Sequence, residues 1–319
     1  MPFYFIKKIT EGYLSNNFIL KNDHQKYFLK QYRFGEKYRI EEIHKAKELF
    51  HKYNIPLIFP LKTRLGKTYF SFQGNHYALF PFIQGKMIKH KSLSPAGMRS
   101  VGRLLAAIHL VSKEKCPRII KPRSFRWDLN KLAKNTDLLL KKIAKKKSGG
   151  LFDKKARYSL LLRSALAERL TFSFEEFRFK NTHIMHGDFH QRNMFFDRKG
   201  EVTHIYDWEK INQSPREIEL ARALEFFCFY GNHLKNNYEL ASVFLKEYSK
   251  YYPFQKNALA NGIRAWYGNQ LCTLWIEDNH YLKNNFRTDC FLEGHIKFLE
   301  YYSKNLEKHI RLVTSNLRP

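Results

Sequence analysis

The sequence predicts an α+β protein of two lobes: a small β-rich lobe with one long helix in residues 1–83 and a larger, mainly helical lobe in residues 84–319. The length of 319 residues is the first observation behind this prediction, because it exceeds the roughly 100–200 residues of a single domain. The second is a composition of 44% hydrophobic and 16% aromatic residues, which can bury a large core and excludes a disordered chain. The third is a change of pattern after Gln84–Gly85, where short β-type runs give way to helical periodicity.

The first lobe carries short runs of aromatic and β-branched residues that predict strands. The clearest runs are Phe18–Leu20, Tyr27–Tyr32, Tyr69–Phe72 and His76–Phe82. One helix is expected among them over residues 38–53, with Pro56 beyond its end. One face of this helix carries Ile40, Ile43, Lys47 and Phe50. The expected order is therefore three strands, one helix and two strands.

The second lobe opens with a helix whose start is marked by Ser94 and Pro95 and whose apolar stripe includes Val101, Leu104 and Ile108. A lysine run and a Gly-Gly pair in residues 141–155 predict a helix end followed by an exposed basic loop. From residue 226 onward the chain reads as helical and rich in aromatic residues.

The chain is strongly basic, with 57 Lys and Arg against 29 Asp and Glu and a formal net charge of +28. Such a field attracts anions, so peripheral contact with an anionic surface is possible, and it argues against a polycationic acceptor unless a local acidic pocket overcomes it. Compositional drift explains the same charge equally well. Nucleic acid is not an expected partner, because no helix-turn-helix, zinc or RNA-binding pattern accompanies the charge.

The four cysteines are far apart and follow no metal-binding spacing, which fits a reducing compartment. The N-terminal residues lack the apolar core of a signal peptide, and no stretch approaches the ~20 apolar residues of a membrane span. We therefore expect a cytoplasmic protein that does not insert into a membrane.

Candidate catalytic residues concentrate in residues 184–210, IMHGDFHQRNMFFDRKGEVTHIYDWEK. A polar turn, His186 to Asn193, leads into a predicted hairpin, Met194–Asp197 and Val202–Tyr206, and Asp207 stands at its end. Two carboxylates and one amide are thus expected to converge. Phosphoryl transfer needs such a set, because one carboxylate must take the proton of the acceptor hydroxyl while metal ions neutralise the phosphate oxygens.

Asp188 suits the role of the catalytic base, while Asn193 and Asp207 offer the hard oxygen ligands that Mg²⁺ prefers. His186 is expected to orient the loop. The pattern His186-Gly187-Asp188 to Asn193, followed by Asp207-Trp208, resembles the signature of the aminoglycoside phosphotransferase, choline kinase, homoserine kinase and spore-coat kinase family. The resemblance covers roughly residues 8–225 and implies a protein-kinase-like fold, ATP and Mg²⁺ as cofactors, and these same roles for the three polar residues.

Other stretches resemble the family less sharply but in the expected order. The run from Gly12 is similar to its phosphate-covering hairpin, which makes Gly12, Ser15 and Asn17 candidates for nucleotide contact. Lys30 stands where the family has the strand lysine that contacts the phosphates. Such a lysine needs an acidic partner on the helix, and we expect Glu42, with Glu41 close behind.

The segment of residues 77–85 looks like the strand whose backbone meets the adenine edge, which makes Phe80 and Phe82 candidates. Relatives often have Asp-Leu-Ala after the metal aspartate, and this chain has Glu219-Leu220-Ala221, so Glu219 is a candidate support for the catalytic loop. His109 ends a helix typical of the family and is expected to be a packed residue.

The sequence thus favours a kinase that moves the γ-phosphate of ATP to a hydroxyl of an amino alcohol, amino acid or sugar. One alternative is a catalytically silent, kinase-like scaffold or coat protein. Another is a kinase of an anionic glycan or lipopolysaccharide sugar. The aromatic residues after position 226 could form a cage for a quaternary ammonium, although a helical aromatic stripe is more often plain core.

Overall fold

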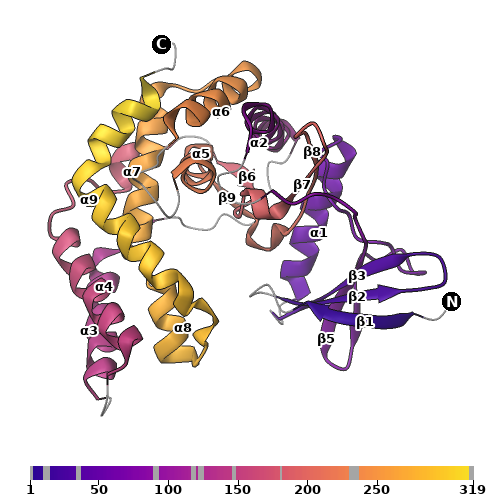
Figure 1. Ribbon diagram of the computed structural model, residues 1–319, viewed down its shortest axis with the longest axis horizontal. Coiled ribbons are helices and arrows are strands. Elements are labelled where there is room, and N and C mark those ends of the chain that lie inside the picture. Colours follow the sequence, from indigo (N-terminus) through magenta and orange to yellow (C-terminus); the bar gives the residue numbers. More distant parts are fainter. Residues whose placement is uncertain are drawn as a thin grey trace. The chain divides into compact units, whose positions relative to one another are not determined.

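The structure is a computed structural model that describes residues 3–9, 15–33, 37–88, 93–115, 120, 126–145, 149–179, 182–229 and 237–315 (Figure 1). The chain forms two compact units, each drawn from separated segments. Unit 1 comprises Met1–Pro122, His183–Gln213 and Glu247–Tyr252. Unit 2 comprises Arg123–Thr182, Ser214–Lys246 and Pro253–Pro319.

Unit 1 contains a five-stranded antiparallel sheet with strand order β1-β2-β3-β5-β4. Its strands are β1 (Tyr4–Ile9), β2 (Ser15–Lys21), β3 (Lys26–Tyr32), β4 (Phe70–Phe72) and β5 (Asn75–Pro81). Helix α1 (Lys37–Lys52) follows β3 in the chain. The predicted order of three strands, a helix and two strands is confirmed, and so is the α+β class.

Helix α1 packs on the sheet through a small apolar cluster in which Ile40 meets Tyr32, Ala78 and Phe80. Its N-terminal turn is also fixed to the segment after β8 (Val202–Ile205). The guanidinium of Arg39, only 3% exposed, donates a hydrogen bond of 3.1 Å to the carbonyl of Glu209 and another to the carbonyl of Ile211. These bonds satisfy a buried cation with backbone dipoles.

The rest of unit 1 is built around helix α2 (Pro95–Lys115), which packs against strand β6 (His183–Met185). Strand β6 pairs with β9 (Asn212–Ser214), and β7 (Met194–Phe196) pairs with β8 in the predicted hairpin. His109 is fully buried on α2 and is 2.9 Å from the hydroxyl of Tyr248. As expected, it is a packed helix residue.

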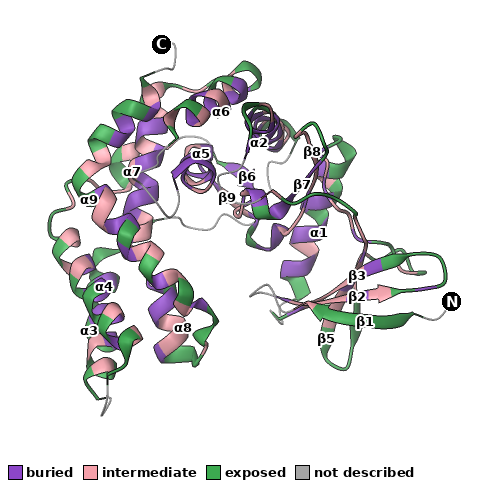
Figure 2. Ribbon diagram, viewed as in Figure 1, coloured by how far each residue is buried: buried purple, intermediate pink, exposed green. Residues whose placement is uncertain are grey.

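Unit 2 is mainly helical in its described residues (Figure 2). Its longer helices are α3 (Leu129–Ala144), α4 (Leu151–Ala167), α5 (Arg216–Leu224), α7 (Lys256–Cys272), α8 (Trp275–Lys283) and α9 (Leu292–Thr314). Helix α6 (Tyr238–Tyr251) begins in unit 2 and ends in unit 1. On α7, Trp266 and Tyr267 are buried, so they belong to the core, whereas Trp275 on α8 is 38% exposed.

One expectation for this unit is wrong in part. Residues 141–155 were expected to end a helix and continue as a loop, but α4 already begins at Leu151. The physical reason is a helix cap, because the carboxylate of Asp153 accepts a hydrogen bond of 2.9 Å from the backbone N–H of Gly150.

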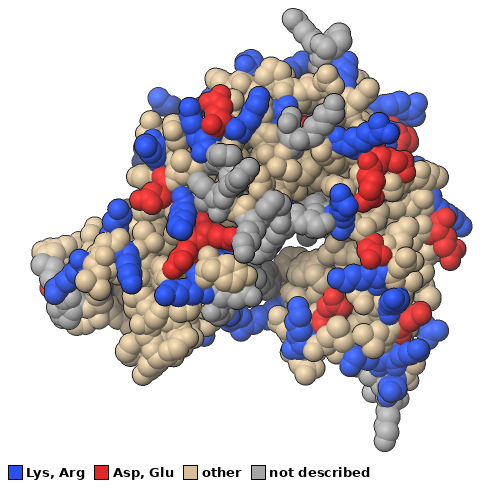
Figure 3. Space-filling model, turned by 180° about the vertical axis from the view of Figure 1, so that it is seen from behind, with Lys and Arg blue, Asp and Glu red and all other residues tan. Residues whose placement is uncertain are grey.

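Lys and Arg side chains lie over much of the face seen in Figure 3, with acidic side chains between them. No helix within the described residues is both long and apolar enough to span a bilayer.

Candidate active site

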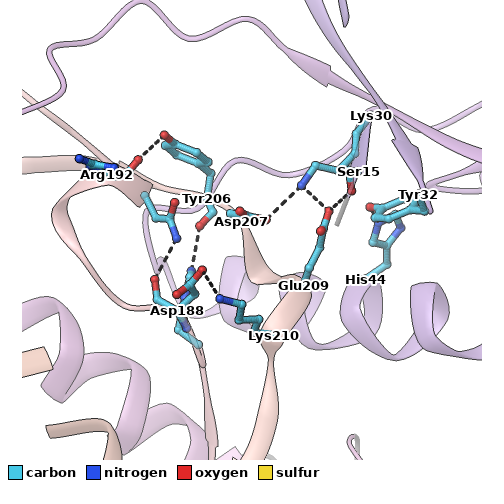
Figure 4. A network of polar contacts seen from close by, with 12 residues as sticks. Ser15, Lys30, Tyr32, His44, Asp188, Arg192, Tyr206, Asp207, Glu209 and Lys210 are labelled. Atoms are coloured by element: carbon cyan, nitrogen blue, oxygen red, sulfur yellow. Dashed lines mark hydrogen bonds and ion pairs between the residues drawn. The ribbon is translucent and has the colours of Figure 1, made fainter. Parts of the chain in front are cut away.

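The turn after β6 holds the first group of predicted catalytic residues. Gly187 has φ of 76°, a left-handed conformation that favours glycine, and a side chain there would meet the backbone of Lys210. The backbone N–H of Asp188 donates to Nδ1 of His186 over 3.2 Å, so Nε2 of this ring carries the proton and donates to the carbonyl of Tyr206 over 2.8 Å. These two bonds tie the turn to the end of β8 and fit the orienting role expected for His186 (Figure 4).

Asn193 closes the same turn. Its side-chain Nδ2 donates a hydrogen bond of 2.9 Å to the backbone carbonyl of Asp188. The backbone carbonyl of Asn193 accepts a hydrogen bond of 3.0 Å from the backbone N–H of Tyr206. Because the amide nitrogen is engaged in this way, Oδ1 is the atom of this side chain that can act as an acceptor or a metal ligand.

The carboxylate of Asp188 is flanked by two basic side chains. Its Oδ2 is 3.1 Å from Nζ of Lys210, and its Oδ1 is 3.6 Å from Nε2 of His190. The Asp188 side chain is only 13% exposed. A carboxylate at this position can accept the proton of a hydroxyl group.

Asp207 follows β8 and adopts a left-handed backbone conformation with φ of 60°. Its Oδ1 lies 3.2 Å from Nζ of Lys30. Burial opposes ionisation of this carboxyl, but the Lys30 ammonium outweighs it and holds the pKa of Asp207 below its ordinary value. Asp207 is therefore a carboxylate at neutral pH.

Lys30 on β3 has a second and closer partner, Glu209, whose Oε1 is 2.5 Å from its ammonium. The same carboxylate oxygen accepts a hydrogen bond of 2.5 Å from the hydroxyl of Ser15 on β2. Burial works against the charge of Lys30, yet Asp207 and Glu209 together raise the pKa of its ammonium above the usual value. The structure thus brings Ser15, Lys30 and Asp207 together, as the sequence suggested, and adds Glu209.

The expected pairing of Lys30 with a glutamate of the helix is wrong. Glu42 lies 3.3 Å from Arg39 on its own helix, and Glu41 accepts a hydrogen bond of 2.8 Å from the hydroxyl of Tyr69. The two glutamates have partners of their own, and the counter-ion of Lys30 comes from the turn after β8 instead. Glu42 was expected to bind the cofactor through its pairing with Lys30, and the structure does not show that pairing.

The remaining predicted nucleotide residues are placed as follows. Asn17 lies opposite Lys30 in the register of β2 and β3, and Phe80 lies opposite Phe28 in that of β3 and β5. Phe82 is half-buried beyond β5, with Nζ of Lys26 at 5.9 Å from its ring centre. Gly12 lies outside the described residues. Glu219 is buried on α5 in unit 2.

Sequence reasoning missed two charged residues of this site, Glu209 and Lys210. Both follow Asp207 directly, in the short 3-10 turn Trp208–Lys210. The sequence shows both residues directly after Asp207, but no local pattern distinguishes them from ordinary charged turn residues. The left-handed backbone at Asp207 sends Glu209 to Lys30 and Lys210 to Asp188.

The donor set fits a magnesium ion. Asp207 supplies a charged carboxylate and Asn193 a neutral amide oxygen, both from the segment between β6 and β9, and hard oxygen ligands suit Mg²⁺. Among the residues that the structure describes, no group of three or more His, Cys, Asp or Glu side chains is arranged to hold a metal ion, so these two residues are the protein ligands that this site offers.

An N-terminal sheet packed on one helix, a polar turn bonded to the end of β8, and an acidic turn paired with a strand lysine define a kinase-like phosphotransferase. The chain belongs to the phosphotransferase enzyme family, whose sequence profile matches residues 6–252. It is accordingly a kinase acting on hydroxyl acceptors. No curated protein sequence matches this chain.

Solved structures show the same fold at low sequence identity. A spectinomycin phosphotransferase in complex with ADP and spectinomycin has a TM-score of 0.62 and 16% identity, over 99% of this chain and 93% of that one. A microcompartment-associated aminopropanol kinase has a TM-score of 0.64 and 14% identity, over 97% and 94% of the two chains. An amicoumacin kinase in complex with AMP-PNP and Ca²⁺ has a TM-score of 0.62 and 13% identity, over 96% and 88%.

Proposed function

We propose that the protein is an ATP- and Mg²⁺-dependent kinase that transfers the γ-phosphate to a hydroxyl of a small molecule. The observation that carries the proposal lies inside unit 1, where the carboxylates of Asp188 and Asp207 are neighbours and Asp207 pairs with Lys30 (Figure 4). The side chain of Asn193 bonds to the carbonyl of Asp188 in the same region. The nucleotides in the spectinomycin phosphotransferase and amicoumacin kinase complexes support ATP as the donor.

In the proposed reaction, Asp188 accepts the proton of the acceptor hydroxyl as its oxygen attacks the γ-phosphorus. The bond from the γ-phosphorus to the bridging oxygen breaks, and ADP leaves with the electron pair. Lys30 would hold the phosphates, and the support for this role is an ammonium kept charged and fixed by Asp207 and Glu209. His186 positions Asp188 through the backbone bond described above.

Asn193 and Asp207 are the residues that would hold Mg²⁺. When bound, the ion neutralises charge on the phosphate oxygens as the transition state forms. Asn193 contributes orientation, because its Nδ2 bond to the carbonyl of Asp188 fixes where its Oδ1 points.

The acceptor belongs to this proposal only as a class: an amino alcohol, an amino acid or a sugar. The similarity to an aminopropanol kinase supports an amino alcohol as the acceptor. The similarity to a spectinomycin phosphotransferase supports a larger ring system instead. A lobe boundary after residue 83 and a cytoplasmic location stay predictions.

Acceptor-dependent ADP release with a panel of hydroxyl compounds tests the proposal. The Asp188→Asn variant is expected to lose about 10²–10⁴-fold in kcat, because the amide cannot take the proton. Asp137→Asn, on the exposed surface of α3, is the matched control and should keep its activity. Turnover that survives Asp188→Asn would remove the base from the mechanism. A wild-type protein without any ADP release, and without a thermal shift on adding ATP and Mg²⁺, would favour the silent scaffold.

A further inference from the structure

Helix α1 buries a second lysine close to Lys30. Lys47 is only 5% exposed, and its ammonium lies 4.5 Å from the ring centre of Phe80 on β5. Within the described part of the chain, its ammonium makes this cation–π contact and no hydrogen bond or ion pair to a carboxylate. A buried ammonium without an anionic partner is rare, because burial removes its hydration without replacing it.

The position of Lys47 relative to the sheet follows from strand register. Lys30 and Phe28 alternate with Leu29 on β3, and they pair with Ala78 and Phe80 on β5, so Lys30 and Phe80 project from the same face. Lys47 approaches this face from α1, one helical turn after His44. It therefore stands beside the face of the sheet on which the nucleotide phosphates are proposed to bind.

The other charged groups near Lys47 are already engaged with one another. Asp207 and Glu209 are bound to Lys30, and His44 bonds to the hydroxyls of Tyr32 and Thr68. Burial, followed by repulsion from Lys47 and Lys30, lowers the pKa of His44 to about 3, so this ring is neutral. Within the described residues, the carboxylates nearest to Lys47 are the two paired with Lys30, and none forms an ion pair with Lys47 itself.

We propose that Lys47 is a second phosphate-binding ammonium of the nucleotide site, and that its missing counter-charge is a phosphate group of the bound nucleotide. The inference rests on the proposed ATP-dependent function and adds a residue to it. It also explains why a carboxylate is absent from this face of α1: a glutamate there would neutralise the cation before the nucleotide arrived.

The titration of Lys47 gives the proposal a distinctive signature. Burial, with repulsion from Lys30 next, lowers the pKa of Lys47 to about 7 in the free protein. Among the groups that face it, Lys30 and Tyr32 have raised pKa values and stay protonated, Asp207 has a lowered one, and His44 is neutral. Above neutral pH, Lys47 must therefore regain a proton when a phosphate binds, and affinity falls by at most about tenfold per pH unit.

The test is equilibrium binding of ATP, ADP, AMP and adenosine to the purified full-length protein at about pH 7.5 and about pH 9, where the phosphates of ATP are fully ionised. The wild type is expected to bind ATP at least ~5-fold more weakly at the higher pH. Lys47→Met should lower the affinity for ATP by ~10-fold or more at about pH 7.5 and remove its pH dependence. The affinity for adenosine should stay unchanged. Lys47→Arg keeps its charge, so its ATP affinity should be independent of pH.

Lys45→Met, at an exposed position of the same helix, is the matched control and should behave as the wild type. Three results would overturn the inference: Lys47→Met binding ATP with the wild-type affinity and pH dependence, equal losses for ATP and adenosine, or an equal loss in Lys45→Met. In each of these the wild type still binds nucleotide, so the proposed function stands. A wild type that binds no nucleotide overturns both.

Discussion

Strand β3 and helix α1 each bury one lysine in unit 1, and the two lysines are stabilised in opposite ways. Lys30 has two carboxylate neighbours at 2.5 and 3.2 Å, and its pKa is raised in spite of burial. Among the described residues, Lys47 has an aromatic ring at 4.5 Å and no ion pair with a carboxylate, and its pKa is lowered to about 7. Burial is similar in the two cases, so the partners decide the charge state.

The difference separates two uses of a buried cation. A paired ammonium keeps its charge over the whole working range of pH and serves as a fixed feature of the site. An unpaired ammonium lowers the stability of the free protein, and that cost is recovered only when an anion arrives. Unit 2 offers a third arrangement in Arg163, which is fully buried, lies 3.8 Å from Glu277 and donates to the carbonyl of Gln270 over 2.7 Å.

The largest effect on this comparison should come from Glu209→Gln. The change removes the closest counter-ion of Lys30 and weakens the bond to Ser15, while Asp207 remains. We expect the free energy of unfolding to fall by about 2–4 kcal/mol, because a buried charge loses its main partner. Urea denaturation measures it. Glu48→Gln, with a side chain 63% exposed, is the control and should change by less than ~0.5 kcal/mol. Equal losses of unfolding free energy in Glu209→Gln and Glu48→Gln would contradict the view that Glu209 stabilises the charge of Lys30.

A smaller effect of opposite sign is expected for Lys47→Met in the absence of nucleotide. The folded state holds the proton of Lys47 less tightly than the unfolded chain does, since the pKa falls from 10.5 to about 7. The loss of folding stability caused by burying the charged ammonium is therefore complete below a pH of about 7. It disappears as the pH approaches 10.5, the pKa of the lysine in the unfolded chain. Removing the charge should stabilise the protein by about 1–3 kcal/mol at neutral pH and by less at about pH 9.

Urea denaturation at the two pH values checks this expectation, with Lys45→Met as the control. A loss of stability in Lys47→Met would mean that the contact with Phe80 outweighs the cost of the buried charge.

The smallest effect is expected for Glu42→Gln. Its carboxylate pairs with Arg39, whose guanidinium keeps its bonds to the carbonyls of Glu209 and Ile211. We expect a change in the free energy of unfolding below about 1 kcal/mol and ATP affinity within ~2-fold of the wild type. Unfolding free energy and ATP affinity should be measured for Glu42→Gln and Glu209→Gln side by side. An ATP affinity reduced as far as in Glu209→Gln would restore the helix glutamate as the partner of Lys30.

Much of unit 1 could be predicted from the sequence because its signals are local. Alternating aromatic and β-branched residues marked the strands, and the helix over residues 38–53 differs from α1 by one residue at each end. The turn from His186 to Asn193 and the hairpin after it were predictable for the same reason. Gly187, the paired strands β7 and β8 and the acid after them all lie within one short segment.

What could not be predicted depends on packing between distant segments. Periodicity shows which residues of α1 share a face, but the hydroxyl of Tyr69 and the guanidinium of Arg39 decide which glutamates are engaged. The partnership of Lys30 with Glu209 joins residues far apart in sequence and depends on the left-handed backbone at Asp207. No local pattern reports such a conformation at an aspartate.

The bonds from Arg39 to the carbonyls of Glu209 and Ile211 join the start of α1 to the turn that carries Asp207. In this protein, the helix and the acidic turn are thereby coupled mechanically. A ligand or mutation that shifted α1 away from the sheet would also displace Asp207, the proposed magnesium ligand. Inhibition from the outer side of α1 would then act on the catalytic chemistry as well as on nucleotide affinity.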